Sequence, residues 1–176
     1  MPLQVASPTT RYESSFLAML AEYEHLEPHN AEIYTPAKAN FEAYVHSLQD
    51  EELGRNLPDG WVPCSHRWLI VEDHVVAVVR VRHNINTSFL ASSAGHIGYD
   101  VRPSRRGNGF GHCAMRMGLT EARAQGIDRA LLYTGATNLA SRAIIERAGG
   151  VLESISFSTY WNEDLCRYWA SPPAEA

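Results

Sequence analysis

The chain has 176 residues, of which 45% are hydrophobic and 20% are charged, and its formal net charge at pH 7 is −5. This composition is typical of a folded globular protein and excludes a disordered or fibrous chain, while the acidic balance argues against a nucleic-acid partner. No run of 18 apolar residues occurs, so we expect no membrane partner. Cys64, Cys113 and Cys166 form no C-x-x-C motif, which predicts neither disulfides nor a metal site and favours a cytoplasmic location.

The first sixty residues show helical periodicity in two places. Over residues 10–24, apolar residues recur at the spacing of one helix face, namely Phe16, Met19, Leu20 and Tyr23. The same spacing predicts a second helix with Pro36 near its start, through Phe41, Tyr44, Val45 and Leu48. Between them, residues 27–35 are predicted to form a loop.

Three strands are predicted next. Residues 67–71 and 75–82 are rich in β-branched residues and are separated by a short turn, which indicates a hairpin. After a loop over residues 84–94, residues 96–101 form the third strand, which ends where Pro103 removes a backbone donor.

The rest of the chain alternates between helices and strands. A helix over residues 109–125 ends at Gly126, and a strand over 129–134 follows. Because a strand, helix and strand of this length nearly always form a right-handed parallel unit, we expect residues 129–134 to run parallel to the third strand. A short helix over 138–148 and strands near 151–157 and 165–170 complete one mixed α/β domain.

A glycine-rich segment lies where the third strand leads into a helix. Its sequence runs Arg106-Gly107-Asn108-Gly109-Phe110-Gly111-His112, with Arg102 and Arg105 just before it. Glycines let backbone N–H groups approach an anion, and the helix start adds free N–H donors and a positive dipole end, which is typical of a pyrophosphate site. A P-loop lysine is missing, since Lys38 is the only lysine, and His112 stands where a dinucleotide fingerprint needs its third glycine.

The pattern Arg106-x-x-Gly109-x-Gly111 resembles the acetyl-coenzyme A loop of the Gcn5-related N-acetyltransferase (GNAT) family. The segment Asn138-x-x-Ser141-x-x-Ile144-Ile145-Glu-Arg-x-Gly149 is similar to the family signature Asn-x-x-Ala-x-x-Leu-Tyr-Glu-Lys-x-Gly. The order of elements is also similar. More narrowly, five segments of the chain resemble a bacterial branch of predicted acetyltransferases. They are Gly60-Trp-Val-Pro63, Arg82-His83-Asn-Ile-Asn86, Gly95-His-Ile-Gly-Tyr99, Val101-Arg-Pro-Ser104 and Arg167-Tyr-Trp169.

The resemblance implies the GNAT-like acyl-CoA N-acyltransferase fold of the α/β (mixed α+β) class. In that fold a central mixed, mostly antiparallel sheet is flanked by helices and contains a parallel β-α-β unit that binds the coenzyme. We expect one domain over residues 1–176, with a helical substrate-side segment (1–60), an acetyl-CoA-binding core (95–150) and C-terminal strands (151–170).

The resemblance also implies where acetyl-CoA binds. In the family, the strand before the glycine loop diverges from its neighbour, and the pantetheine arm of the coenzyme inserts between them. The backbone of Tyr99 and Val101 is then expected to bond the pantetheine amides. The N–H groups of Arg106, Gly107, Asn108, Gly109, Phe110, Gly111 and His112 are expected to hold the pyrophosphate. Asn138 and Ser141 are expected near the pantetheine arm, although Asn138 also suits a helix N-cap.

Acetyl transfer to an amine needs a base for the amine and an acid for the departing thiolate. His96 and Asp100 share one face of the third strand, and His96 titrates near neutrality, so it is the first candidate base; a histidine satisfied within the sheet is the alternative. Many family members place a tyrosine acid where this chain has Ile145. Tyr133, Tyr160 or water would then have to replace it, and Tyr133 is our candidate.

Loops and aromatic residues are the candidates for acceptor recognition. Trp61, His83 and Asn86 are the main ones, and the others are Tyr34, Trp68, Tyr160, Trp161 and Glu163. The predicted function is transfer of an acetyl group from acetyl-CoA to a primary amine of a small molecule, by direct attack in a ternary complex. Alternatives are a protein N-terminal or lysine acetyltransferase, a non-catalytic acyl-CoA-binding or regulatory module, and a nucleotide-binding interaction domain. A homodimer is compatible with the sequence, which does not determine the oligomeric state.

Overall fold

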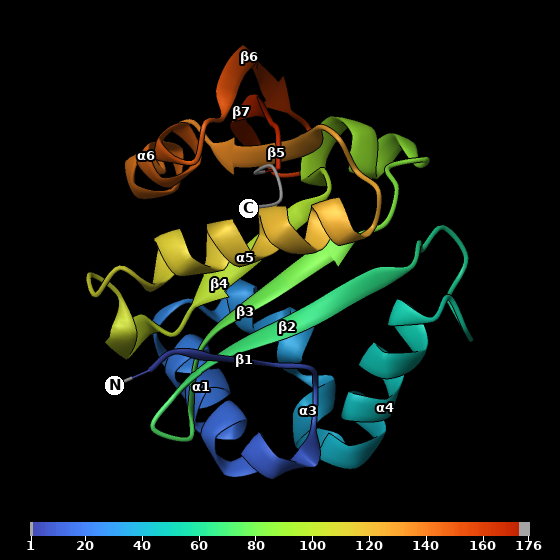
Figure 1. The fold of residues 1–176 in the computed structure, drawn as a ribbon, viewed down its shortest axis with the longest axis vertical. Helices are drawn as coiled ribbons and strands as arrows, with labels where there is room; N and C mark the ends of the chain where they lie inside the picture. Colours follow the sequence, from blue (N-terminus) through green and yellow to red (C-terminus); the bar gives the residue numbers. More distant parts are fainter. Residues whose placement is uncertain (1, 173–176) are drawn as a thin grey trace.

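The computed structural model describes residues 2–172, whose strands form two antiparallel sheets flanked by helices (Figure 1). The strands are β1 (Gln4–Ala6), β2 (Cys64–Val71), β3 (His74–Arg82), β4 (Ile97–Val101), β5 (Ala130–Gly135), β6 (Val151–Ser158) and β7 (Glu163–Ala170). The α-helices are α1 (Glu13–Leu26), α2 (Pro28–Ala31), α3 (Pro36–Ala39), α4 (Phe41–Glu52), α5 (Phe110–Ala124) and α6 (Leu139–Arg147). Shorter helical turns are η1 (Thr10–Tyr12), η2 (Glu32–Tyr34), η3 (Leu90–Ala94) and η4 (Pro103–Arg105). None of the helices in the described part of the chain is long and apolar enough to cross a bilayer.

The two predicted N-terminal helices are present, the second one as the pair α3 and α4. The loop expected over residues 27–35 is wrong, because α2 and η2 occupy it. Pro28 and Pro36 each stand at a first helical position, where the missing N–H costs little, so they begin short helices. Asn40 then separates α3 from α4: its backbone is extended, and its side chain accepts a hydrogen bond from the Ala43 N–H at 2.9 Å.

Helices α1 and α4 cover one face of the four-stranded sheet through an aromatic core (Figure 1). The ring of Phe16 on α1 lies 4.9 Å from that of Trp68 on β2 and 5.5 Å from that of Phe41 on α4. Tyr23 and Tyr34 are buried in the same core. This packing holds the helical segment rigidly against the sheet.

The four-stranded sheet has the order β1-β2-β3-β4 with antiparallel pairs throughout. The predicted hairpin of β2 and β3 is confirmed. Strand β1 was not predicted, because three residues are too few to show a periodicity. Helix α5 begins after Gly109 and ends before Gly126, as predicted, and covers the second face of the sheet. Its contacts form a second core that includes Ala114, Met115, Leu119, Val79 and Ile97.

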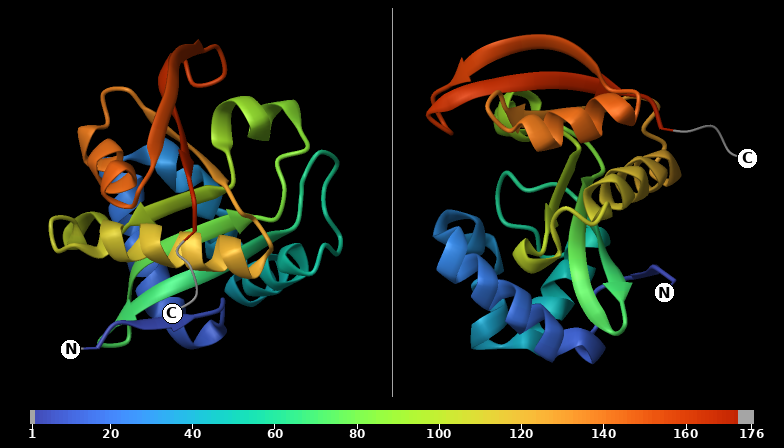
Figure 2. Two further views of the ribbon diagram at one scale, coloured as in Figure 1. Left: turned by 45° about the horizontal axis from the view of Figure 1, so that its top comes forward. Right: turned by 90° about the vertical axis from the view of Figure 1, so that its left-hand side faces the viewer.

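The second sheet has the order β5-β7-β6 and lies across the end of the molecule away from α1 and α4 (Figure 2). Both of its pairs are antiparallel, and the predicted C-terminal strands and α6 are present. Cys166 and Tyr168 on β7 join the core that underlies α5. The second sheet is therefore packed on the first one through shared side chains.

The two sheets are joined by hydrogen bonds only near the start of β4. Gly95 and Leu132 form an isolated antiparallel bridge, and the His96 N–H donates to the Leu131 carbonyl at 2.8 Å. Beyond this point no ladder joins β4 to β5 within residues 2–172, so the expected parallel pairing of residues 129–134 with the third strand is not formed. The facing edges of β4 and β5 stay unpaired, and we call the space between them the β4/β5 gap.

Gly95 and His96 make this junction possible. Gly95 has a φ of +67°, and a Cβ there would lie 2.9 Å from the Leu131 carbonyl carbon and closer still to its oxygen. The buried ring of His96 accepts a hydrogen bond at Nδ1 from the Leu131 N–H at 2.9 Å. Burial lowers the pKa of His96, and the nearby Arg82 guanidinium lowers it further. The ring is therefore neutral near pH 7, with its proton on Nε2.

We expect Gly95→Ala to lower the free energy of unfolding by about 2–4 kcal/mol, because the methyl group meets the backbone of β5 and the left-handed backbone disfavours a side chain. Urea unfolding measures this loss. The matched control is Gly60→Ala, which has a φ of +80° but nothing within 4 Å of the added carbon, and should cost about 1 kcal/mol. Equal losses in the two variants would contradict a close contact between the strands.

We expect His96→Asn to flatten the acid side of the stability profile. The folded-state pKa of His96 lies below its unfolded value of about 6.5, so the unfolded chain binds more protons and stability falls as the pH drops below that value. Asparagine cannot titrate, and its side-chain oxygen can accept from the Leu131 N–H. Urea unfolding at pH 7.5 and pH 5 should show a smaller loss for the variant than for the wild type; an identical loss would exclude His96 as a source of acid sensitivity.

Candidate active site

The edge of β4 that faces the gap presents free backbone N–H groups, while the Val101 carbonyl accepts from the Tyr23 hydroxyl at 2.7 Å and from Arg106 Nε at 3.2 Å. The Arg82 N–H of β3 donates to the His96 carbonyl at 2.8 Å, which sets the alternation of the ladder. Even-numbered residues of β4 therefore bond to β3, and Tyr99 and Val101 direct their N–H and C=O groups away from it. The N–H groups of both residues have no partner within the described chain, as a strand-like ligand in the gap would require.

The glycine loop forms a cradle of N–H donors. Gly107 and Gly109 have φ values of +78° and +81°, in the left-handed region that favours glycine, and nothing lies within 4 Å of a Cβ built on either of them. Within residues 2–172 no acceptor is bonded to the N–H groups of residues 107–111. The N–H groups of Arg106 and His112, which were also expected to hold the pyrophosphate, instead donate to the Pro103 carbonyl at 3.2 Å and to the Gly109 carbonyl at 3.1 Å. Free donors beside the N-terminus of α5 fit a pyrophosphate.

The Asn108 side chain holds the cradle in shape. Its Nδ2 donates to the carbonyls of Arg105 and Arg106, at 3.2 and 3.0 Å. These bonds turn two acceptors inward, away from where an anion would bind. Phe110 is half-buried against the core under α5, and His112 is exposed on the first turn of the helix.

Two of the three arginines at the cradle are neutralised by carboxylates. The Arg102 Nε bonds Glu22 at 2.6 Å, and Arg106 forms a two-pronged pair with Glu27 in which Nη2 lies 3.1 Å from Oε2. The pKa of Glu27 is lowered by this hydrogen bond to Arg106. Arg105 has no carboxylate within 4 Å among the described residues. The charged pairs fix the loop to α1 and its end, and the backbone supplies the anion donors.

Two more of the expected cofactor residues lie at α6. Asn138 caps this helix, accepting a hydrogen bond from the Ser141 N–H at 3.1 Å, which matches its alternative role. The Tyr99 hydroxyl donates to Ser141 Oγ at 3.5 Å, and burial raises the pKa of Tyr99, so the hydroxyl keeps its proton. The structure therefore brings Ser141 next to β4, while the exposed Asn138 lies one turn further away.

His96 and Asp100 are both engaged in structural bonds, which argues against the expected base. A neutral His96 that accepts at Nδ1 carries its proton on Nε2, so neither nitrogen is free to take a proton from an amine. The Asp100 carboxylate pairs with Arg80 at 2.6 Å and accepts from the Tyr34 hydroxyl at 2.5 Å. The side chains share one face, as predicted, but each is fixed by its neighbours.

Tyr133 on β5 lines a large cavity. Its hydroxyl donates to the Ala91 carbonyl at 2.8 Å and accepts from Arg167. Ile145, at the family's tyrosine position, is only 2% exposed and packs in the core under α5. A side chain at position 145 therefore faces the core, while Tyr133 and Tyr160, the two tyrosines expected to replace it, both line the cavity.

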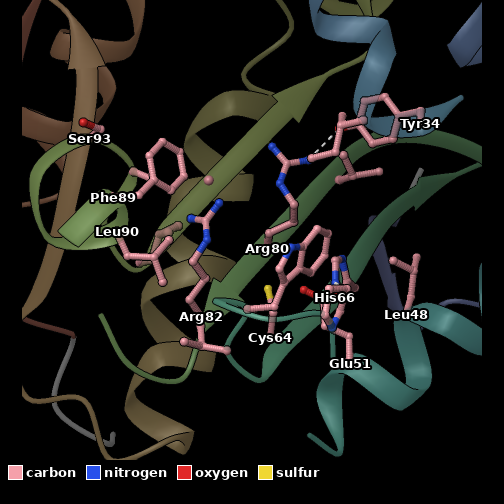
Figure 3. Close-up of a pocket in the computed structure, with 18 of the residues that line it drawn as sticks. Tyr34, Leu48, Glu51, Cys64, His66, Arg80, Arg82, Phe89, Leu90 and Ser93 are labelled. Carbon is pink, nitrogen blue, oxygen red and sulfur yellow. Dashed lines mark hydrogen bonds and ion pairs between the residues drawn. The ribbon is translucent and has the colours of Figure 1, made fainter. Parts of the chain in front are cut away.

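The cavity has a volume of about 1000 Å³ and lies on the face of the four-stranded sheet that carries α4. Its floor is made of side chains from β2 and β3, its first wall of α4 and η2, and its second wall of η3 and the β6–β7 turn (Figure 3). The Trp161 Nε1 donates to the Ser93 carbonyl at 3.0 Å, which joins the two parts of the second wall. Ile97 and Gly98 of β4 and the end of β5 also line it, so the β4/β5 gap opens into this cavity.

Most of the expected acceptor residues lie at this cavity. Trp61 lines it, and so do the further candidates Tyr34, Trp68, Tyr160, Trp161 and Glu163. His83 and Asn86 do not: the His83 Nε2 bonds Ser65 Oγ at 2.9 Å on the α5 side of the sheet, and Asn86 is exposed in the loop after β3. Alternation explains the correction for His83, because it follows the inward-facing Arg82 and must face the other way.

The sequence reading missed the polar floor of the cavity. Cys64 and His66 on β2, and Arg80 and Arg82 on β3, all point into it, and the His66 Nε2 bonds Glu51 of α4 at 2.9 Å (Figure 3). A signal was present on β3, where Arg80 and Arg82 stand two positions apart in an otherwise apolar run, which places them on one face. On β2 it was hidden, because Ser65 and Arg67 make the first four positions polar on both faces.

Glu51, Cys64 and His66 place one potential ligand atom each within 4.8 Å of one another. This geometry is compatible with a metal ion, although the chain spacing did not predict one. Burial raises the pKa of Cys64 to about 12, so its sulfur is a thiol near neutral pH. A metal ion would have to displace that proton.

Glu163 lies at the junction of gap and cavity. A Cβ on Gly135, the last residue of β5, would lie 3.1 Å from the Glu163 carboxyl carbon, so the carboxylate occupies the space that a side chain would fill. Glu163 forms no ion pair with another described residue. A carboxylate without an ion pair in that part of the chain therefore lies over the end of β5 and lines the cavity.

Comparisons with known proteins agree with this geometry. The family model for the acetyltransferase (GNAT) family matches residues 21–150. Among solved structures, RimL, a ribosomal L7/L12 alpha-N-protein acetyltransferase in complex with coenzyme A, aligns with a TM-score of 0.72 at 15% identity over 98% of this chain and 96% of that one. RimJ from Mycobacterium smegmatis, in complex with a CoA-disulfide, aligns with a TM-score of 0.70 at 18% identity, over 96% of this chain and 81% of that one. The microcin C7 self-immunity acetyltransferase MccE, in complex with acetyl-CoA and AMP, aligns with a TM-score of 0.67 at 14% identity, over 96% of this chain and 92% of that one.

No curated protein sequence matches the chain significantly. The structural alignments confirm the expected fold, and the family match covers the glycine loop, the β4/β5 gap and α6. It also confirms the expected enzyme class and cofactor, since the family transfers acetyl groups from acetyl-CoA. With more than half of its length matched by that model, the chain belongs to the acetyltransferase (GNAT) family.

Proposed function

We propose that this enzyme transfers the acetyl group of acetyl-CoA to a primary amine of a small molecule bound in the cavity. The observation that carries the proposal is the continuity of the β4/β5 gap with a cavity of about 1000 Å³, a volume suited to a small molecule. In this proposal residues 1–60 form the acceptor wall of a single domain, residues 95–150 hold the cofactor, and residues 151–170 complete the second wall.

The cofactor would bind along β4. The N–H groups of residues 107–111 would hold its pyrophosphate, and Tyr99 and Val101 would offer backbone groups to the pantetheine arm. The loop N–H groups and the N–H groups of Tyr99 and Val101 support this assignment, because they have no hydrogen-bond acceptor in the described part of the free protein and the cofactor would supply one. Ser141 would lie beside the arm through its contact with Tyr99.

Glu163 is our candidate for the base. Its carboxylate is free of ion pairs, lines the cavity and lies against Gly135 at the end of β5, where the gap opens. His96 lacks these properties because both of its ring nitrogens are committed. A carboxylate also attracts the protonated form of the incoming amine, which would bring the acceptor to the reacting end of the cofactor.

Tyr133 is our candidate for the acid, because its hydroxyl lies at the cavity and Arg167 donates to its oxygen. In the free protein its proton is donated to the Ala91 carbonyl, so the hydroxyl has to turn from that carbonyl to the sulfur when the cofactor is bound. The amine nitrogen bonds to the thioester carbonyl carbon as the bond from that carbon to sulfur breaks, giving the N-acetylated amine and the thiol of coenzyme A. Glu163 takes the proton that the amine loses, Tyr133 supplies the proton that the sulfur gains, and solvent restores both residues.

A protein N-terminus is the second candidate acceptor, and the similarity to RimL favours it. The bond from Trp161 to Ser93 favours the small molecule instead, because it closes one wall of the cavity where an extended peptide would have to leave. Turnover with a panel of small primary amines and with short peptides separates the two candidates.

We expect Gly109→Glu to weaken acetyl-CoA binding about 100-fold or more, since it places a carboxylate in the N–H cradle against the pyrophosphate. The matched control is Gly126→Glu at the other end of α5: both glycines have a left-handed φ and open space around a Cβ, so backbone strain and charge change are alike. Calorimetry with acetyl-CoA checks both variants. Unchanged affinity in Gly109→Glu would remove the loop from the cofactor site.

We expect Glu163→Gln to lower kcat about 100-fold while the KM for acetyl-CoA is unchanged, because only proton transfer from the amine is impaired. Asp164→Asn removes the same charge one residue further along β7, on the other face of the strand, and should retain full activity. A Glu163→Gln variant that keeps the wild-type kcat would exclude Glu163 as the base.

A further inference from the structure

Arg82 is a half-buried arginine of the cavity floor that lacks a carboxylate partner within residues 2–172. Arg80, Arg102 and Arg106 each bond a carboxylate, and so does Arg67 on β2. The half-buried guanidinium of Arg82 has no carboxylate within 4 Å in the described residues. One of its nitrogens donates to the Gly95 carbonyl at 3.2 Å, and this is its one hydrogen bond within that part of the chain.

The position of Arg82 is built into the sheet. It stands on β3 opposite Cys64 of β2, and its side chain points into the cavity beside Phe89 and Leu90 (Figure 3). The bond to Gly95 ties the guanidinium to the junction where β4 and β5 begin. The remaining donors of the group are left for an acceptor inside the cavity.

Burial and the neighbouring Arg80 lower the pKa of Arg82, while Cys64 and Glu51 only partly oppose this. A cation held in this environment without a partner costs free energy, which a bound anion would recover. The charge of Arg80 needs no such anion, because Arg80 pairs with Asp100 and donates to the Tyr34 hydroxyl, although its buried Nε has no acceptor among the described residues.

The balance of charge points to a singly charged anion. The floor carries one uncompensated cation, while the carboxylates of Glu51 and Glu163 also line the cavity and would repel a doubly charged group. A carboxylate matches the guanidinium in charge and in planar shape, and it can accept two parallel hydrogen bonds.

We propose that the acceptor amine carries a carboxylate and that Arg82 binds it, so the substrates are amino acids in the broad sense. This inference rests on the proposed function. The acceptor then spans the cavity between two opposite charges, with its carboxylate at Arg82 on β3 and its amine at Glu163 beside β5. Phe89, Tyr160 and Trp161 supply apolar contacts for the rest of the molecule.

The test compares amino acids with their primary amides, which keep the amine and lose the charge. The probes are β-alanine, γ-aminobutyrate, 6-aminohexanoate, leucine and phenylalanine, each beside its amide, with acetyl-CoA as donor. We expect at least one acid to exceed its amide in kcat/KM by tenfold or more, as a charge-assisted hydrogen bond predicts. Equal values in every pair, or a preference for the amides, would overturn the inference.

Variants then assign the discrimination to Arg82. Arg82→Gln can keep the bond to the Gly95 carbonyl without the charge, and should raise the KM for the preferred acid about 10-fold to 100-fold while the KM for acetyl-CoA and the rate with the amide stay unchanged. Arg82→Lys keeps the charge and should retain part of the preference. The matched control is Arg55→Gln, which removes an exposed arginine from the rim of the same cavity. This variant should keep the full preference for the acid over its amide.

Two outcomes separate this inference from the proposed function. Acetylation of the acids and the amides at equal rates would support the proposed function and overturn the role of Arg82. If Arg82→Gln lowered kcat equally for an acid and for its amide, that result would likewise support the function and overturn the role of Arg82. If no amine is acetylated, calorimetry of the same pairs decides: tighter binding of the acids to the wild type than to Arg82→Gln would support the carboxylate site, and no difference would reject it.

Discussion

The unpaired edge between β4 and β5 is the constraint on which the rest of this structure depends. Two strands that lie next to each other normally exchange hydrogen bonds along their length, and an exposed edge is costly unless something else satisfies it. Here the two strands are held together at one end by Gly95 and by the bonds between His96 and Leu131, and they diverge from that point. A pinned junction and a free edge together make a slot that widens away from the junction, which a strand-like ligand can fill.

Ion pairs fix the surroundings of the slot. Arg102 and Arg106 lie at the cofactor loop, yet their charges are paired with Glu22 on α1 and with Glu27 just after that helix. Partly buried pairs of this kind hold segments that are far apart in the chain in one arrangement. The loop that they fix then presents its own backbone donors, so its rigidity comes from side chains and its affinity for an anion comes from the main chain.

Glycines also decide where the charged groups of the cavity lie. At Gly98 the Arg80 guanidinium lies over β4, with Nη2 3.4 Å from the position of a Cβ, and at Gly135 the Glu163 carboxylate takes the corresponding space over β5. A larger residue at either position would displace the charge above it. The polarity of the site thus depends on the absence of two side chains as much as on the presence of the charged ones.

The amino-acid sequence by itself determined the local structure and the cofactor loop. Periodicity located α1, α4, α5 and the β2–β3 hairpin, and the glycines after β4 indicated an anion cradle, because these features depend on residues close in the chain. The sequence did not reveal β1, the short helices α2 and η2, or the partners of His96, Asp100 and Arg106. Only the tertiary structure decided that His96 is committed to β5, that Ile145 faces the core, and that Arg82 and Glu163 share one cavity. The physical reason is that a side chain's hydrogen bonds and charge partners come from segments distant in the chain, and their identity depends on how the sheets and helices pack.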